Sequence, residues 1–229
     1  MKRFYKNAVS QRAEGGYEIL LDGRGVKTPA RQRLVVPNER LGQAIAVEWN
    51  EQGETVSPRS MPLTGLASAA IDHVAPDPQA FARSLAIFGE SDLLCYRADQ
   101  PRGLVARQSE QWDPLLAWAR RRYDVDFEVV TGIMHRPQPD RTVSQLARAA
   151  AAHSAPELAA LAPLVTVSGS LLIGLALAEE EISFETGWSA ATLDEQWQLE
   201  QWGADAEAEK ALDSRRHDFE AGYRLLKLL

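Results

Sequence analysis

The spacing of apolar residues predicts a β-hairpin near the start of the chain. Residues 17–21 read YEILL, Asp22 and Gly23 follow, and a second short run ends at residue 29. Because Asp-Gly readily adopts the positive φ angles of a tight turn, we expect the two runs to pair as antiparallel strands. Residues 34–36 (LVV) indicate one further strand.

Two helices are expected next. Pro37 suits the first turn of a helix that runs to about residue 52. The apolar positions of this helix recur at helical spacing and form one stripe: Leu41, Ala44, Ile45 and Trp49. Residues 63–74 form a second apolar helix, and the prolines at positions 76 and 78 end it.

Beyond residue 76 the pattern is helical almost throughout. We expect helices over residues 78–95, 102–123, 142–153, 156–166, 169–181, 184–201 and 204–227, and a short strand over 127–130. The apolar run 164–178 is too short for a membrane span, so we expect a buried core helix there. The predicted fold class is α+β, with a small mixed N-terminal domain (residues 1–76) and a larger, mostly α-helical domain (residues 77–229).

Composition narrows the class of protein. Apolar residues make up 45% and charged residues 25% of the 229 positions, which is ordinary for a globular protein. The single cysteine, Cys95, excludes an internal disulfide, and its apolar neighbours favour a buried, unreactive thiol. The N-terminus lacks the apolar stretch of a secretory signal, so we expect a cytoplasmic protein.

Charge is distributed unevenly along the chain. Residues 1–36 carry eight Lys and Arg against three Asp and Glu, whereas residues 179–213 carry eleven acidic residues against one lysine. With a net charge of -7, the chain lacks the basic surface of a nucleic-acid-binding protein. The acidic block could attract a basic protein partner, or it could simply be a solvated helix face.

No pattern for catalysis or for cofactor binding is found. GRGVKT (residues 23–28) lacks the spacing of a phosphate-binding loop, and the turn explains its glycines. The histidines at positions 73, 135, 153 and 217 lack the spacing of metal ligands. We therefore expect no catalytic residues, no cofactor and no metal site.

The segment 193–205 (LDEQWQLEQWGAD) is the strongest candidate for a functional surface. Aromatic rings among charged groups are typical of protein contact sites. A second interpretation is a capping box between Thr192 and Glu195, with Leu193 and Trp197 in the core, and the residues alone do not decide between the two. The candidate partner-binding residues are Asp194, Glu195, Trp197, Glu200, Trp202 and Asp205, together with Trp49, which could instead be a core residue.

Several strings, in order along nearly the whole chain, resemble the ATP12 family of assembly chaperones. They are FYK (4–6), GYEILLDGRGVKTP (16–29), AIAVEW (44–49), MPLTGLASAAID (61–72), DLLCYRA (92–98), QWDPLLAW (111–118), GSLLIGLAL (169–177) and DEQWQLEQWGAD (194–205). The resemblance implies a chaperone that binds the unassembled alpha subunit of the F-type ATP synthase catalytic head until beta subunits replace it. It implies no ATP hydrolysis and a small α+β domain before a larger helical one.

Within the segment, the resemblance points to Glu195 first and Glu200 second as the match to an acidic residue associated with function in mitochondrial members of the family. Trp197 and Trp202 would supply apolar contact. We expect a bacterial cytoplasmic protein, with relatives in the mitochondrial matrix, that is monomeric when free and neither binds nucleic acid nor inserts into membranes. Two alternatives remain: a small-molecule enzyme with a site between its domains, and a structural subunit of a larger complex.

Overall fold

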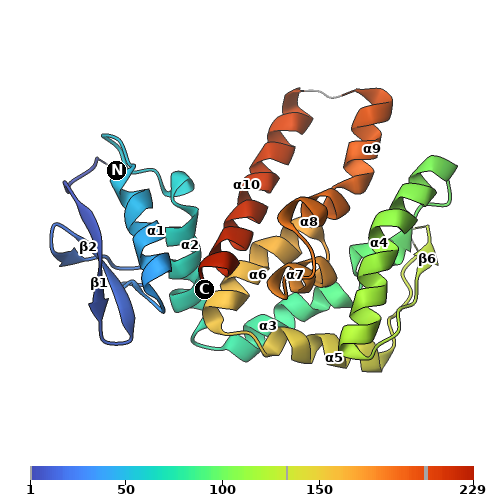
Figure 1. Cartoon of the computed structure of the whole chain (residues 1–229), viewed down its shortest axis with the longest axis horizontal. Helices are drawn as coiled ribbons and strands as arrows, with labels where there is room; N and C mark the ends of the chain where they lie inside the picture. Colours follow the sequence, from blue (N-terminus) through green and yellow to red (C-terminus); the bar gives the residue numbers. More distant parts are fainter. Residues whose placement is uncertain (1, 133, 204–205) are drawn as a thin grey trace. The chain divides into compact units, whose positions relative to one another are not determined.

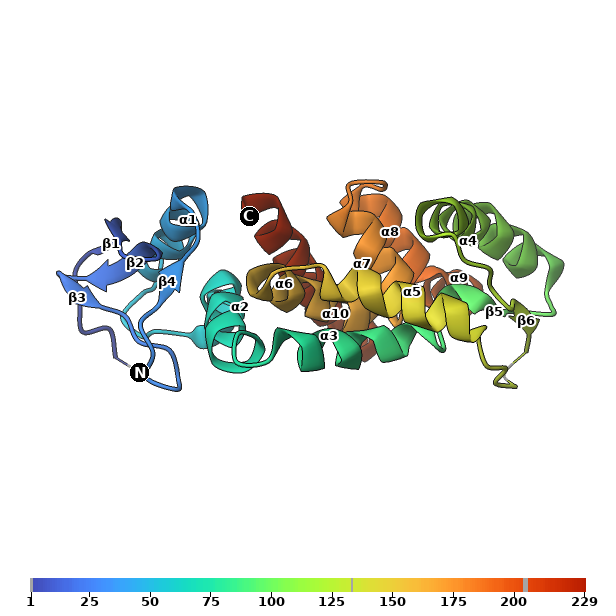
Figure 2. The same cartoon turned by 90° about the horizontal axis from the view of Figure 1, so that it is seen from below.

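The computed structural model describes residues 2–132, 134–203 and 206–229. The chain divides into two units, of which the first comprises Met1–Pro78, Ser154–Ala160 and Arg224–Leu229, and the second Gln79–His153 and Leu161–Tyr223. A small sheet-containing region is followed by a mostly helical one, which confirms the predicted fold class (Figures 1 and 2). The hydrophobic pattern gave no reason to place residues 154–160 and 224–229 with the first unit.

The sheet of the first unit is antiparallel. Its strands are β1 (Ala8–Ala13), β2 (Gly16–Leu21), β3 (Arg24–Gly25) and β4 (Val35–Val36); β2 pairs with each of the other three. The predicted turn is confirmed, because Asp22 and Gly23 have φ angles of 49° and 80° between the paired residues Leu21 and Arg24. The pattern missed β1 because half of the residues of this edge strand are polar and only Ala8 in it is buried.

Helix α1 (Glu39–Asn50) contacts β1 and β2 (Figure 1). The side chain of Asn38 caps it, since its Oδ1 accepts a hydrogen bond from the backbone nitrogen of Leu41 at 2.9 Å. Pro37 therefore precedes the helix instead of forming its first turn, which corrects the prediction. Asn38 also donates through Nδ2 to the carbonyl of Leu228 at 2.8 Å, so the C-terminus of the chain joins the first unit.

A buried carboxylate accepts the hydrogen bonds at the start of the next helix. Helix α2 (Pro62–Ala69) continues into a π-helical turn (Ala70–Val74), and together they account for the predicted helix over 63–74. Glu48, only 4% exposed, accepts hydrogen bonds at 2.8 Å from the backbone nitrogens of Leu63 and Thr64 and from the Thr64 hydroxyl. Burial raises the pKa of Glu48. Glu48 thus supplies from α1 the acceptor that the first turn of α2 needs.

The rest of the chain is mostly helical. Its helices are α3 (Pro78–Ala86), α4 (Arg102–Tyr123), α5 (Asp140–Ala151), α6 (Ala155–Ser168), α7 (Leu171–Ala178), α8 (Phe184–Ala191), α9 (Leu193–Trp202) and α10 (Ala206–Leu228). Two short strands, β5 (Tyr96–Arg97) and β6 (Val130–Thr131), pair in parallel. Pro114 lies within α4 and does not end it.

Three of the elements predicted beyond residue 76 need correction. The helix expected over 78–95 ends at Ala86 and gives way to short 3-10 turns. The helix expected over 184–201 is two helices, because Thr192 leaves the helical conformation and its hydroxyl bonds to the carbonyl of Trp188. The strand expected over 127–130 contains only Val130 of that range and extends to Thr131.

The apolar run 164–178 is divided between the end of α6 and α7, with the break at Gly169 and Ser170, and α7 is buried as predicted. All residues from 171 to 177 are buried, and those other than Gly174 are at most 1% exposed. Among the described residues, no helix is long and apolar enough to cross a membrane. Cys95 is buried as predicted, and burial raises the pKa of its thiol to about 12.

Asp92 is fully buried at the start of α7. Its Oδ1 accepts hydrogen bonds from the Ser170 hydroxyl at 2.7 Å and from the backbone nitrogen of Leu94 at 3.1 Å, and its Oδ2 accepts one from the nitrogen of Leu172 at 3.0 Å. Ser170 in turn accepts from the nitrogen of Ile173 at 3.0 Å. Burial raises the pKa of Asp92 to about 6, against the hydrogen bonds that favour its charged form.

Replacing Asp92 should destabilise the second unit. Asp92→Asn is expected to lower the free energy of unfolding at pH 7 by about 1–3 kcal/mol, because an amide nitrogen cannot accept the hydrogen bonds of the oxygen it replaces. The raised pKa adds a pH dependence. The folded state takes up a proton as the pH falls through about 6, before the unfolded state does near 3.8, so this group favours the fold more at pH 5 than at pH 7.

Chemical denaturation at both pH values tests this expectation. The wild-type advantage over Asp92→Asn should be larger at pH 5, whereas the exposed Asp99→Asn should change stability little at either pH. Equal differences at the two pH values would contradict the assignment.

Candidate functional site

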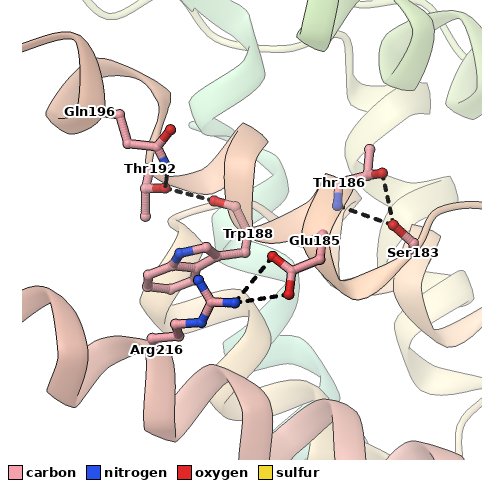
Figure 3. Close-up of polar contacts among 7 residues, drawn as sticks. All are labelled: Ser183, Glu185, Thr186, Trp188, Thr192, Gln196 and Arg216. Carbon is pink, nitrogen blue, oxygen red and sulfur yellow. Dashed lines mark hydrogen bonds and ion pairs between the residues drawn. The ribbon is translucent and has the colours of Figure 1, made fainter. Parts of the chain in front are cut away.

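The junction between α8 and α9 fixes the start of the candidate segment. Trp188 is 4% exposed, and its carbonyl accepts a hydrogen bond from the Thr192 hydroxyl at 2.7 Å (Figure 3). The side chain of Gln196 donates to the same hydroxyl at 2.7 Å. Thr192 makes no side-chain cap to α9, so the capping box with Glu195 is wrong.

Arg216 of α10 contacts Glu185 and Trp188 of α8 at this junction. Its guanidinium donates to both carboxylate oxygens of Glu185, at 2.8 and 3.1 Å, and lies 5.8 Å from the centre of the Trp188 ring (Figure 3). A guanidinium over an indole face is attracted by the negative potential of the ring. This contact links α10 to α8 beside the start of α9.

The acidic residues of α9 are engaged within the protein. Asp194 accepts a hydrogen bond from the side chain of Gln108 at 2.8 Å. Glu200 pairs with Arg107 at 2.8 Å, which lowers the pKa of Glu200. Glu195 pairs with Arg215 of α10, and its second oxygen, Oε2, is buried without a hydrogen-bond partner within the described residues. These carboxylates therefore position α9 against α4 and α10.

Trp197 packs onto α4. Arg107 lies 4.9 Å from the centre of its ring, and a Cβ at Gly103 would come within 2.7 Å of the ring. The indole is partly buried, so Trp197 serves as a contact between helices as well as a surface group. Arg107 binds both Trp197 and Glu200, one turn of α9 apart.

In contrast to Trp197, Trp202 is 79% exposed. It borders a groove between α9 and α10 with a volume of about 390 Å³, and Figure 1 shows the two helices side by side and antiparallel. We call this the α9–α10 groove; its lining includes Glu195, Leu199, Trp202, Ala208, Leu212 and Arg215. Asp205, the remaining candidate of the segment, lies outside the described residues.

Trp49 belongs to the first unit and lies in its core at 8% exposure. Its ring contacts Tyr5 edge-on at 5.6 Å between centroids, and the Tyr5 hydroxyl donates to the Trp49 carbonyl at 2.6 Å. Its neighbour Glu48 was not among the predicted residues, although positions 41, 45 and 48 share the apolar stripe of α1. Arg107 and Arg215 were not predicted either, and no sequence signal points to them because they lie on other helices than α9.

Comparison with known proteins identifies the class. The family model described as ATP12 chaperone protein matches residues 2–120, about half of the chain. The chain belongs to the ATP12 family, which confirms the resemblance seen in the sequence. This is a family of chaperones for ATP synthase assembly and not of enzymes.

Individual relatives extend the match to the whole chain. The mitochondrial protein atp12 of Schizosaccharomyces pombe is 26% identical over 215 residues, which cover 89% of this chain and 74% of that protein. The crystal structure of Atp12 from Paracoccus denitrificans matches with a TM-score of 0.93 at 39% identity, covering 99% of this chain and 97% of the other. The Atu1473 protein from Agrobacterium tumefaciens gives a TM-score of 0.94 at 42% identity over 99% and 85%.

The Trp197 contact predicts that a side chain at position 103 will loosen α9. Gly103→Val should displace the indole ring from α4 and lower the free energy of unfolding by about 1–3 kcal/mol, as overpacking does elsewhere. Amide hydrogen exchange should increase over residues 193–202. Gly53→Val is the control, because nothing lies within 4 Å of a Cβ at that position. Unchanged exchange in α9 would show that Trp197 does not depend on Gly103.

Proposed function

We propose that this chaperone binds the unassembled alpha subunit of the F-type ATP synthase catalytic head through the α9–α10 groove. Membership of the ATP12 family supports a role in assembling that enzyme. The proposed location is the bacterial cytoplasm, supported by solved relatives from two bacteria at 39% and 42% identity. Binding and release are non-covalent in this proposal, and the client leaves when another subunit takes its place.

The exposure of Trp202 is the observation that supports this surface most strongly. A large aromatic ring that is 79% exposed leaves much apolar surface in contact with water, and such rings anchor protein contacts. The neighbouring groove adds the apolar side chains of Leu199 and Leu212. An unassembled subunit exposes the apolar surface that its partners will later cover, which this combination could shield.

The carboxylates of α9 have a supporting role in this proposal. Glu195 and Glu200 each hold a neighbouring helix through an arginine, and both remain about half exposed. They can therefore keep α9 in place and still attract basic groups on the client. Glu195 is the stronger candidate for direct contact, because its side chain is 45% exposed and lines the groove.

Removing the Trp202 side chain should weaken client capture without unfolding the chaperone. Trp202→Ala is expected to weaken binding of the alpha subunit about tenfold or more, as for a central aromatic contact, and to change the free energy of unfolding by less than about 0.5 kcal/mol. Co-purification of co-expressed alpha subunit and chemical denaturation measure the two effects. Met134→Ala, a similarly exposed residue at 78%, is the control. Equal capture by both variants would exclude Trp202 as the anchor.

A charge swap separates the two roles of Glu195. Glu195→Arg and Arg215→Glu, made singly, should each lower the free energy of unfolding by roughly 0.5–1 kcal/mol, because each places like charges side by side. The double variant restores an ion pair of reversed direction, so most of its stability should return, although the hydrogen bond from Arg215 to the Val167 carbonyl stays lost. If the client is attracted by the negative charge of Glu195, affinity for the alpha subunit should not return. Recovery of both stability and affinity would show that Glu195 acts only through Arg215.

A further inference from the structure

Both helices that border the α9–α10 groove turn one helical face toward it. The lining residues of α9 lie at positions 195, 198, 199 and 202, and those of α10 at positions 208, 211, 212 and 215. Each set follows the spacing i, i+3, i+4 and i+7, which places its members on one side of a helix. The groove is therefore a seam between two helical faces, and it is about 10 Å, or two turns, in length.

The seam is open to solvent although its floor is largely apolar. Ala208 and Ala211 of α10 are exposed, and Leu199 and Leu212 are half-buried. The short alanine side chains allow a third element to approach α10 closely, because the distance between packed helices depends on the side chains at their contact. Two turns of a helix, about 10 Å across and 10 Å long, exceed the groove volume of about 390 Å³, so only one face of such an element would enter.

A helix suits this groove better than an extended segment does. The backbone groups of α9 and α10 along the seam bond within their own helices. An extended segment would lose water from its backbone groups and find few replacements on an apolar floor, which is unfavourable for each unpaired group. A helix pairs its own backbone internally and can insert apolar side chains at i, i+3, i+4 and i+7, as amphipathic helices do in other grooves.

The charge around the groove is negative. Residues 193–213 contain seven acidic residues and one lysine. Arginines on α4 and α10 pair with Glu200 and Glu195, and the segment stays negative when these two pairs are taken into account. Basic side chains along the flanks of a bound helix would be complementary to this charge.

We infer that the α9–α10 groove binds an amphipathic helix of the client, with apolar side chains in the seam and lysine or arginine on its flanks. The inference rests on the proposed function for the identity of the client. It adds the secondary structure and the charge of the segment that is bound. Trp202 lies at one end of the seam, where its exposed ring would cover an apolar side chain of the bound helix.

Three synthetic peptides of about 18 residues, a length at which an isolated helix can form, test the inference against the full chain. The first carries leucines at i, i+3, i+4 and i+7 and lysines on its other face. In the second, two residues other than leucine are replaced by proline, which breaks the helix, and in the third each lysine is replaced by glutamate. Fluorescence anisotropy of the labelled peptides measures binding, and competition with purified alpha subunit shows whether they share its site.

The helical lysine peptide should bind and displace the alpha subunit. The proline and glutamate peptides should each bind at least about tenfold more weakly. The difference between the lysine and glutamate peptides should shrink at high salt, because salt screens the attraction between exposed charges.

A matched pair of variants ties this binding to the groove. Ala211→Leu narrows the seam from within, and leucine is nearly as good a helix former as alanine, so α10 should persist. It should weaken binding of the lysine peptide and of the alpha subunit about tenfold, as expected when a central contact is lost. Ala206→Leu is the control, because residue 206 lies two positions before Ala208, on the side of α10 opposite the groove lining, and it should bind both like wild type.

The outcomes separate this inference from the proposed function. Capture of the alpha subunit that depends on Trp202, together with equal binding of the helical and proline peptides, would overturn the inference while the proposed function stands. Equal binding of the lysine and glutamate peptides at low salt, or unchanged peptide binding by Ala211→Leu, would also overturn it. A wild-type chain that fails to bind the alpha subunit would overturn the proposed function, and the peptides alone would then decide whether the groove takes a basic helix.

Discussion

Glu48 and Asp92 hold a helix start in each unit from inside the core. A buried carboxylate is strongly unfavourable unless it is hydrogen-bonded, and the first amides of a helix are unfavourable unless they find acceptors. Each carboxylate meets both needs at once, and the positive end of the helix dipole adds to the attraction. Glu48 thereby fixes the start of α2 in the first unit. Asp92 fixes α7, the helix around which the second unit packs.

The α9 segment shows how a contact surface can be kept without disturbing the fold. Two of its carboxylates pair with arginines on α4 and α10, and a third accepts a hydrogen bond from a glutamine on α4, so the helix is held from two sides. Trp197 is used in the same way, between α4 and α9. Only Trp202, at the end of the helix, presents a largely uncovered ring. A chaperone needs this combination, because its apolar surface must bind a client and yet remain in place when no client is bound.

Elements with a strong local signal were predicted well. The turn at Asp22-Gly23, the long helix over 102–123 and the buried helix after Ser170 each follow from residues close in sequence. Elements whose limits depend on distant contacts were not. β1 exists because β2 pairs with it. The break at Thr192 was missed for a local reason, because its hydroxyl bonds to the Trp188 carbonyl four residues earlier. Helix α2 was predicted, but the acceptor at its start was not, because Glu48 lies on another helix.

The sequence by itself determined the α+β class, the ATP12 membership and the candidate segment, because periodicity, turn residues and ordered family strings are local properties. Only the tertiary structure decided what each residue of that segment does. Trp49 and Trp202 each lie near the end of a helix, one or two positions after a glutamate, yet Trp49 is 8% exposed and Trp202 is 79% exposed. The partners of Glu195 and Glu200 are arginines 20 and 93 positions away. Such pairs depend on how helices pack, which no spacing along the chain encodes.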